Sequence, residues 1–503
     1  MPETPIPLDQ HRSSHPAHVP GETKDNYRWV VLTVTSFGAL LASLTSGTLI
    51  IALPDILRDL HTNLFALLWI VIGYTLVATV LVLNAGQIAD QLGRARSYTI
   101  GFVVFTAASV LCAVAPNDLL LIGGRVLQGV GGALLMANST ALVTDAFPRR
   151  ELGRALGINA MIIGAGQILG PILGGWLTGF GWRTVFWFNV PIGVIGSIAA
   201  AVLLVEQVRP TARRRFDVLG TVVCVLGLTG LMAGLGFGGI YGWTTWWIVG
   251  GFVLFLVAVP IFVRIERDRP DPLLDFGLFR DRLFAMGNLT SLLNGIARNG
   301  VLFLLVFYLQ GARGYDPVTA GIMLSPLAVG LLVLSPISGA FADRWGSREL
   351  ATIGMVVTGI GLGGLALTIG TDTPFWQLAV WQLVIGAGSG LFNSPNTSAV
   401  MGVVPPAKRG MGAGVRMMLT QVGFMVSVAL ALGLVTSVVK PDVLLAVFSG
   451  TQTGAAGIDL GPFITALRLA FAVGVVASII GAVVSAMRGG HRSHEETGAA
   501  AAA

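Results

Sequence analysis

Apolar stretches of about 20 residues recur along the chain, separated by short polar breaks. Each stretch is long enough to cross the ~30 Å hydrocarbon core of a bilayer as a helix. The pattern therefore predicts an all-α polytopic membrane protein with fourteen transmembrane helices. We place them at 29–53, 66–88, 98–115, 119–143, 155–178, 184–205, 217–239, 245–265, 284–309, 317–341, 350–370, 376–401, 412–436 and 464–486.

Composition agrees with this interpretation. Hydrophobic residues make up 54% of the chain and charged residues 11%, and the mean hydropathy is +0.79. Soluble domains carry about 25% charged residues. This chain has too few charged residues to form the surface of a water-soluble protein.

The distribution of Lys and Arg predicts the orientation. These residues are retained in the short loops that face the cytoplasm. With the N-terminus inside, 23 of the 31 lie in the tails and cytoplasmic loops, 4 in outer loops and 4 within spans. We expect a multi-pass protein of a bacterial inner membrane with both termini cytoplasmic. The net charge of +6 follows from the same bias, so it does not indicate a nucleic-acid partner.

A charged turn occurs twice between apolar runs. The segment 86–96, with the sequence GQIADQLGRAR, returns 253 residues later as GAFADRWGSR at 339–348. Such duplication predicts two related halves, an architecture typical of secondary transporters. If 217–265 is a two-helix insertion, each half keeps about 200 residues, enough for six helices. We divide the chain into a disordered cytoplasmic tail at 1–28, a six-helix bundle at 29–205, the insertion with its cytoplasmic linkers at 206–283, a second six-helix bundle at 284–487 and a cytoplasmic tail at 488–503.

The duplicated turn also suggests a conformational latch. Its glycines let one helix end and the next begin closely, and its acid can pair with a facing arginine or a helix N-terminus. We assign the latch to Gly86, Asp90, Gly93, Arg94, Asp343 and Arg344.

The segment 86–96 resembles the signature loop between the second and third helices of the major facilitator superfamily. Segments 121–129 and 166–175 resemble its fourth-helix motif and the fifth-helix motif of its exporters. Segments 182–193 and 216–220 are similar to marks of the fourteen-spanner drug:proton antiporter family. The resemblance implies a major facilitator fold of two six-helix bundles plus a two-helix insertion, and a function in multidrug efflux.

The exporter motif has a physical content of its own. It consists of Gly166, Gly170, Pro171, Gly174 and Gly175. Three of the glycines share a helix face and permit close helix contact, while the proline removes a backbone donor and bends the helix. This combination fits either a moving hinge or a static packing seam.

Proton coupling lacks its usual group. The resembled family carries an Asp on the first helix, nine residues before the proline of an Ala-Leu-Pro; here Pro54 is present but the Asp position is Thr45. No acid lies in the middle of a predicted span. Coupling would therefore use an acid at a helix end, with Asp55 and Asp90 as candidates, or another ion, or be absent.

Buried cations are functional candidates because an ionisable group inside a span is costly. Arg298 lies near the centre of 284–309 and shares a helix face with Ser291 and Asn294. Arg125 and Gln128 share a face of the fourth span. We expect both groups to line a substrate cavity; the alternative for each is a structural bond between helices.

Other polar and aromatic residues fit the same cavity. Gln382, Ser389, Asn393 and Asn396 form one stripe on the span 376–401, although such groups also join helices. Tyr74 on the second span could stack on an aromatic substrate, or anchor the helix at the membrane interface. We also assign Thr45 on the first span to this cavity.

The predicted function is export of hydrophobic small molecules such as drugs and antibiotics by alternating access, driven by protons. One alternative is an exporter or flippase of a neutral or anionic amphiphile that needs no buried carboxylate. Another is a membrane sensor that does not transport. No nucleophile and base are grouped as an enzyme requires, so we expect neither catalysis nor a cofactor or metal. We expect a functional monomer in the lipid bilayer.

Overall fold

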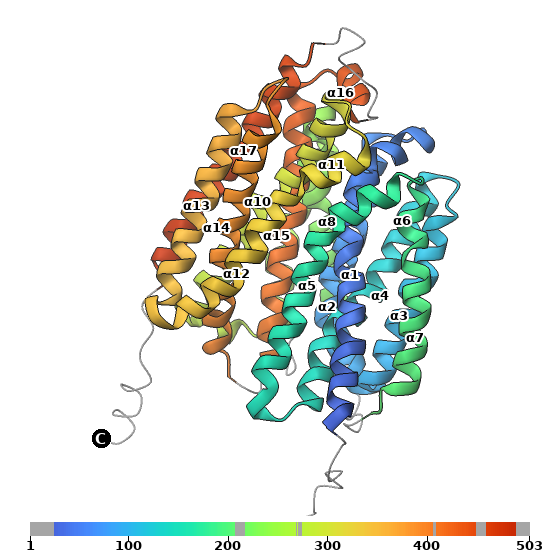
Figure 1. Ribbon diagram of the computed structural model, residues 1–503, viewed down its shortest axis with the longest axis vertical. Coiled ribbons are helices and arrows are strands. Elements are labelled where there is room, and N and C mark those ends of the chain that lie inside the picture. Colours follow the sequence, from blue (N-terminus) through green and yellow to red (C-terminus); the bar gives the residue numbers. More distant parts are fainter. Residues whose placement is uncertain are drawn as a thin grey trace, which may run out of the picture.

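The computed structural model describes residues 25–206, 217–267, 269, 274–405, 409–448 and 459–488, and within them the chain is a bundle of long helices (Figure 1). Thirteen helical segments of this described part are long and apolar enough to cross a membrane. The remaining predicted span, 155–178, coincides with the 30-residue helix α5, which packs along α1. Fourteen crossings therefore stay our prediction, on an all-α polytopic architecture that the structure confirms.

The first half is built from α1 to α7. The bounds are α1 (Asp25–Asp59), α2 (Leu64–Leu92), α3 (Arg94–Ala113), α4 (Asp118–Ala146), α5 (Arg149–Thr178), α6 (Arg183–Trp187) and α7 (Asn189–Leu203). Polar caps define two of the helix starts, because the side chains of Asn63 and Asn117 accept hydrogen bonds from the first-turn backbone of α2 and α4.

The second half runs from α10 to α17. Its elements are α10 (Arg282–Phe307), the π-helical turn η2 (Tyr308–Ala312), α11 (Pro317–Met323), α12 (Ser325–Trp345), α13 (Ser347–Thr368), α14 (Phe375–Gly402), α15 (Arg409–Val438), α16 (Pro441–Phe448) and α17 (Gly461–Ala486). The predicted span 317–341 is broken into α11 and α12, because Pro326 in the first turn of α12 has no N–H to continue the earlier helix. The sequence pattern did not predict α16.

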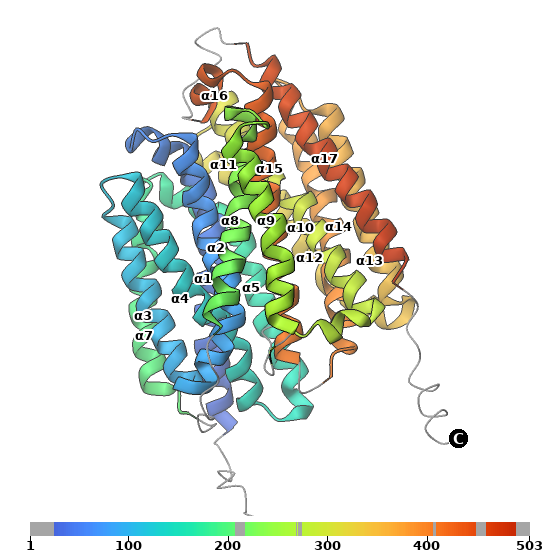
Figure 2. The same ribbon diagram turned by 180° about the vertical axis from the view of Figure 1, so that it is seen from behind.

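Helices α8 (Val218–Tyr241) and α9 (Trp246–Arg267) form the insertion, followed by the 3-10 helix η1 (Phe276–Arg280). They pack on one another, and α8 also packs against α2 of the first half and α15 of the second. Figure 2 shows this pair in front of the junction between the halves. The division of the chain into three parts with the predicted bounds stays a prediction.

We call the two ends of the bundle the near end and the far end. The near end is where α1 begins and α17 ends, and the far end is where α1 ends and α2 begins; the near end is at the bottom of Figure 1. Gly93 and Gly346, which join the second and third helices of each half at the near end, have φ values of +97° and +88°. Only glycine adopts such angles without strain, which explains its presence in both copies of the turn.

Candidate functional site

Arg125 is the centre of a buried polar cluster in the first half. Its side chain is 1% exposed. Nε donates to the carbonyl oxygen of Ile70 at 3.0 Å, and Nη1 donates to Oε1 of Gln128 at 2.5 Å. Gln128 in turn donates to Oγ of Ser109 at 2.9 Å, and the guanidinium lies 4.5 Å from the ring centroid of Tyr74. The predicted pair Arg125 and Gln128 therefore connects α2, α3 and α4.

Tyr74 on α2 and Thr45 on α1 are also buried. The Tyr74 hydroxyl donates to the carbonyl oxygen of Ala42 at 3.0 Å, and the Thr45 hydroxyl donates to that of Leu41 at 2.9 Å. Thr45 thus bonds within its own helix and supplies no titratable group at the position where the resembled family has an acid. A role of either residue in a cavity stays a prediction.

The polar stripe of α14 joins helices in this conformation. The Asn396 amide donates to the carbonyl oxygen of Gly287 at 3.1 Å and to Oγ of Ser291 at 2.9 Å, so it ties α14 to α10. Gln382 donates to the carbonyl oxygen of Met323 at 3.0 Å, which ties α14 to α11. Asn393, by contrast, is partly exposed.

Asn294 and Arg298 differ although they share a face of α10. Asn294 is 4% exposed, and its amide donates to the sulfur of Met355 on α13 at 3.4 Å. Arg298 is partly exposed, and its one described hydrogen bond is a long contact of 3.4 Å from Nη2 to Oδ1 of Asn299. Of the predicted cavity residues, Arg298 and Asn393 are the two that keep exposed surface.

The exporter motif lies where α5 passes α1 and the second half. A Cβ added to Gly170 would lie 2.8 Å from the Cα of Gly47, and one added to Gly174 would lie 2.6 Å from the Cα of Thr48. Gly166 approaches Ser43 of α1 in the same way. These glycines thus pack α5 closely against α1, and both interpretations of the motif, a moving hinge and a static packing seam, stay predictions.

Two further residues of the motif contact the second half. A Cβ on Gly175 would lie 2.4 Å from the carbonyl oxygen of Pro317, and one on Gly321 would lie 2.7 Å from that of Pro171. Gln310 also donates across the halves to the carbonyl oxygen of Ile51 at 2.9 Å. These contacts close the halves together at the far end.

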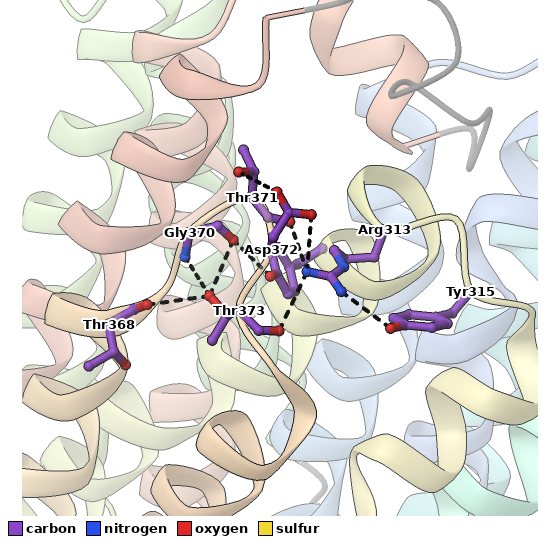
Figure 3. A network of polar contacts seen from close by, with 8 residues as sticks. Arg313, Tyr315, Thr368, Gly370, Thr371, Asp372 and Thr373 are labelled. Atoms are coloured by element: carbon purple, nitrogen blue, oxygen red, sulfur yellow. Dashed lines mark hydrogen bonds and ion pairs between the residues drawn. The ribbon is translucent and has the colours of Figure 1, made fainter.

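Arg313 organises the loops beside this closure (Figure 3). Its guanidinium points into the turn between α13 and α14, where it donates to the carbonyl oxygens of Thr371 at 2.9 Å and Thr373 at 3.4 Å. Tyr315 lies on the other side, 3.4 Å from Nη2. The turn leading from η2 to α11 is thereby fixed to the α13–α14 loop.

Comparison with known proteins identifies the family. The sequence profile of the Major Facilitator Superfamily matches residues 35–218, 216–428 and 287–502. The chain belongs to the Major Facilitator Superfamily. It is 32% identical to the riboflavin transporter RibZ of Clostridioides difficile over 76% of this chain and 83% of that one. It is 35% identical to a probable actinorhodin transporter of Streptomyces coelicolor, over 80% and 71% of the two chains.

Other relatives have names that refer to drug resistance. The multidrug resistance protein Stp of Mycobacterium tuberculosis is 32% identical over 77% of this chain and 72% of its own. Among solved structures, a bacterial homologue of the human lysosomal transporter Spinster superposes with a TM-score of 0.63 at 16% identity, covering 92% of this chain and 97% of that one. The latter likeness concerns the fold alone. The family match and the similar sequences confirm a Major Facilitator transporter, not an enzyme.

The family's signature turn forms bonds within the first half. Arg94 donates through Nη1 to both carboxylate oxygens of Asp145, at 2.6 and 2.7 Å. Its backbone N–H donates to Glu206 at 2.7 Å, and that of Ala95 donates to the same carboxylate at 3.2 Å. Glu206 thus caps the N-terminus of α3 beside Gly93. Gly86 and the side chains of Asp90, Asp343 and Arg344 lie outside the described residues, so the latch stays a prediction.

The acids at helix ends differ in burial. Asp55, a predicted proton site, pairs with Arg58 at the far end of α1. Asp217 at the start of α8 and Glu266 near the end of α9 are 0% and 1% exposed. Asp217 accepts from Arg269 at 2.8 Å, and Glu266 accepts from the backbone N–H of Leu274 at 3.3 Å. The signal for Asp217 was its place before the apolar run of α8, where it caps the helix.

Proposed function

We propose that this protein exports hydrophobic small molecules from the cytoplasm by alternating access. The carrying observation is the close contact of α5 with α11 at the far end, made through Gly175 and Pro171 of the exporter motif. In a bundle of two halves, contacts that seal one end must open for a bound molecule to leave by that end. The distribution of Lys and Arg supports the far end as the external one.

The relatives support the substrate class. The names of the similar proteins refer to riboflavin, actinorhodin and multidrug resistance. A protein with this fold carries both halves in one chain, so we propose that a single copy in the inner membrane is the functional unit.

Export is tested by resistance and efflux in cells that overexpress the protein. We expect lower accumulation of several hydrophobic dyes or antibiotics, and loss of that difference when an uncoupler collapses the proton gradient. Unchanged accumulation of every compound, with the protein present in the membrane, would contradict export.

We further propose that protons drive this export through an acid at a helix end. Asp55 and Asp90 are the candidates, since Thr45 bonds its own helix and cannot titrate near neutral pH. In inverted vesicles, an imposed pH gradient should drive dye uptake, and Asp55→Asn or Asp90→Asn should reduce it. Asp372→Asn is the matched control, because that side chain is 93% exposed in a far-end loop. If dye uptake does not depend on the imposed pH gradient, proton coupling is wrong, while the proposal of export stands.

A further inference from the structure

Arg298 lies near the middle of α10 and keeps exposed surface. Ser291 and Asn294, seven and four residues earlier, share its face of the helix. Their side chains contact Asn396 of α14 and Met355 of α13. Arg298 itself forms no described hydrogen bond with either helix.

The guanidinium of Arg298 has donors without acceptors. Nε is buried and has no hydrogen-bond partner among the described residues, and Nη2 reaches only Asn299 at 3.4 Å. No described carboxylate forms an ion pair with it. An arginine in a span is costly unless its charge is balanced, and it stays protonated at any physiological pH.

The helices around Arg298 do not supply the missing charge. In the described parts of α1, α13, α14, α15 and α17, the acids are confined to helix ends: Asp25, Asp55 and Asp59 on α1, and Glu349 on α13. A permanent cation within a span that keeps exposed surface, with an N–H that has no described partner and no described carboxylate paired with it, is arranged to receive an anion from outside the chain.

We propose that Arg298 recognises a negatively charged group, such as a carboxylate or an acidic phenol, on an aromatic export substrate. This inference rests on the proposed export function and names the substrate's charge. It also bears on the driving force. A bacterial membrane is negative inside, so an anion is driven outward by the potential, by about fifty-fold per charge per 100 mV. Export of such a substrate needs no carboxylate inside the membrane.

Arg416 on α15 provides a matched control. Like Arg298 it lies within a span, and its Nε is buried without a described partner. Its depth in the membrane is different, because Arg416 lies in the second turn of α15, close to the near end where that helix begins. Its long side chain can therefore extend its charge to the near-end surface.

The test uses full-length protein in liposomes and two dyes with the same xanthene ring system, the anionic fluorescein and the cationic rhodamine 123. With equal pH on both sides, a potential is imposed with valinomycin and a potassium gradient. We expect wild-type protein to move fluorescein toward the positive side. Arg298→Gln should lower that rate about ten-fold or more, as loss of a charge-assisted hydrogen bond predicts, and Arg416→Gln should leave it within about two-fold.

The outcomes separate this inference from the proposed function. If rhodamine 123 moves and fluorescein does not, or if Arg298→Gln moves fluorescein at the wild-type rate, recognition of an anion is wrong while export stands. If folded protein moves neither dye nor any compound that it excludes from cells, export itself fails. Should Arg298→Gln not reach the membrane, Arg298→Lys retains the charge without the fork, and its fluorescein rate should fall between the wild-type rate and that of empty liposomes.

Discussion

Arg488 donates a hydrogen bond to the side-chain oxygen of Asn396, and this contact links the residue after the last helix to the near end of α14. Arg488 also donates to the carbonyl oxygen of Ser347 at 3.2 Å and to Oγ of Ser485 at 2.9 Å. Its side chain is 2% exposed, and burial lowers its pKa to about 10, so it is protonated at neutral pH. One charged group thus gathers α13, α14 and α17 at the near end.

Removing this group should destabilise the second half. Arg488→Ala leaves the Asn396 oxygen buried without its charged donor, which costs about 2–3 kcal/mol. Thermal unfolding in detergent measures the loss. Arg348→Ala, a neighbouring exposed arginine, is the control and should leave the melting temperature unchanged. Equal melting temperatures for both variants would show that the Arg488 contacts add nothing.

Gly175 controls the far-end seal. A methyl group there would lie 2.4 Å from the Pro317 carbonyl oxygen, so Gly175→Ala must push α5 and α11 apart. We expect the far end to become accessible to a water-soluble thiol reagent at an introduced cysteine, and export to fall about ten-fold or more. Gly123→Ala on α4 is the control, because nothing lies within 4 Å of its added methyl. A variant that exports normally and stays inaccessible would argue against the seal.

Glu206 caps α3 with a charge. Glu206→Gln removes the negative charge from a helix N-terminus, and Glu206→Ala also removes the acceptor; we expect losses of about 0.5 and 1 kcal/mol. Chemical unfolding in detergent gives both values. The control Glu151→Gln changes a surface ion pair with Arg28 and should have little effect. If Glu206→Ala is as stable as the wild type, capping of α3 by Glu206 does not stabilise the protein.

Asp316 should make the α11 region sensitive to acid. Hydrogen bonds from the Thr319 hydroxyl and from the backbone of Thr319 and Val318 hold the pKa of this carboxyl below its ordinary value of 3.8. The ionised cap therefore contributes fully above pH 3.8 and is lost as the pH falls through the lower folded value. We expect Asp316→Ala to reduce the melting temperature at pH 7, and the difference from wild type to shrink below pH 3.8. A constant difference would contradict the role of the charge.

The contacts of Arg125 depend on its planar guanidinium group. It bonds Ile70 and Gln128 at once while lying against Tyr74, an arrangement that the point charge of lysine cannot reproduce. Arg125→Lys should therefore reduce both export and stability, whereas Tyr74→Phe, which keeps the ring and loses one hydrogen bond, should cost about 1 kcal/mol. Efflux and thermal unfolding of the two variants provide the comparison.

Span positions could be predicted because length and apolarity alone decide them. The stripe of Gln382 and Asn396 could be predicted from helical periodicity, but periodicity does not say what a stripe faces. Here it faces Met323 and Ser291, so the side chains join helices. Arg488 was assigned to the tail because the sequence around it does not indicate its contact with Ser347.

Buried acids were missed for a similar reason. Asp217 lies at a helix end, where an exposed cap is the usual outcome. It is buried, and its carboxylate pairs with Arg269, which follows the insertion in the sequence. A tertiary contact of this kind cannot be recognised from the residues next to Asp217 in the sequence.

The position of α8 against both α2 and α15 has a consequence for entry from the membrane. A molecule dissolved in the lipid meets the insertion on this side of the transporter and cannot pass directly between the halves. On the opposite side, α5 meets α11 and α12 directly. The two lateral faces of the protein are therefore not equivalent, because the insertion covers one of them.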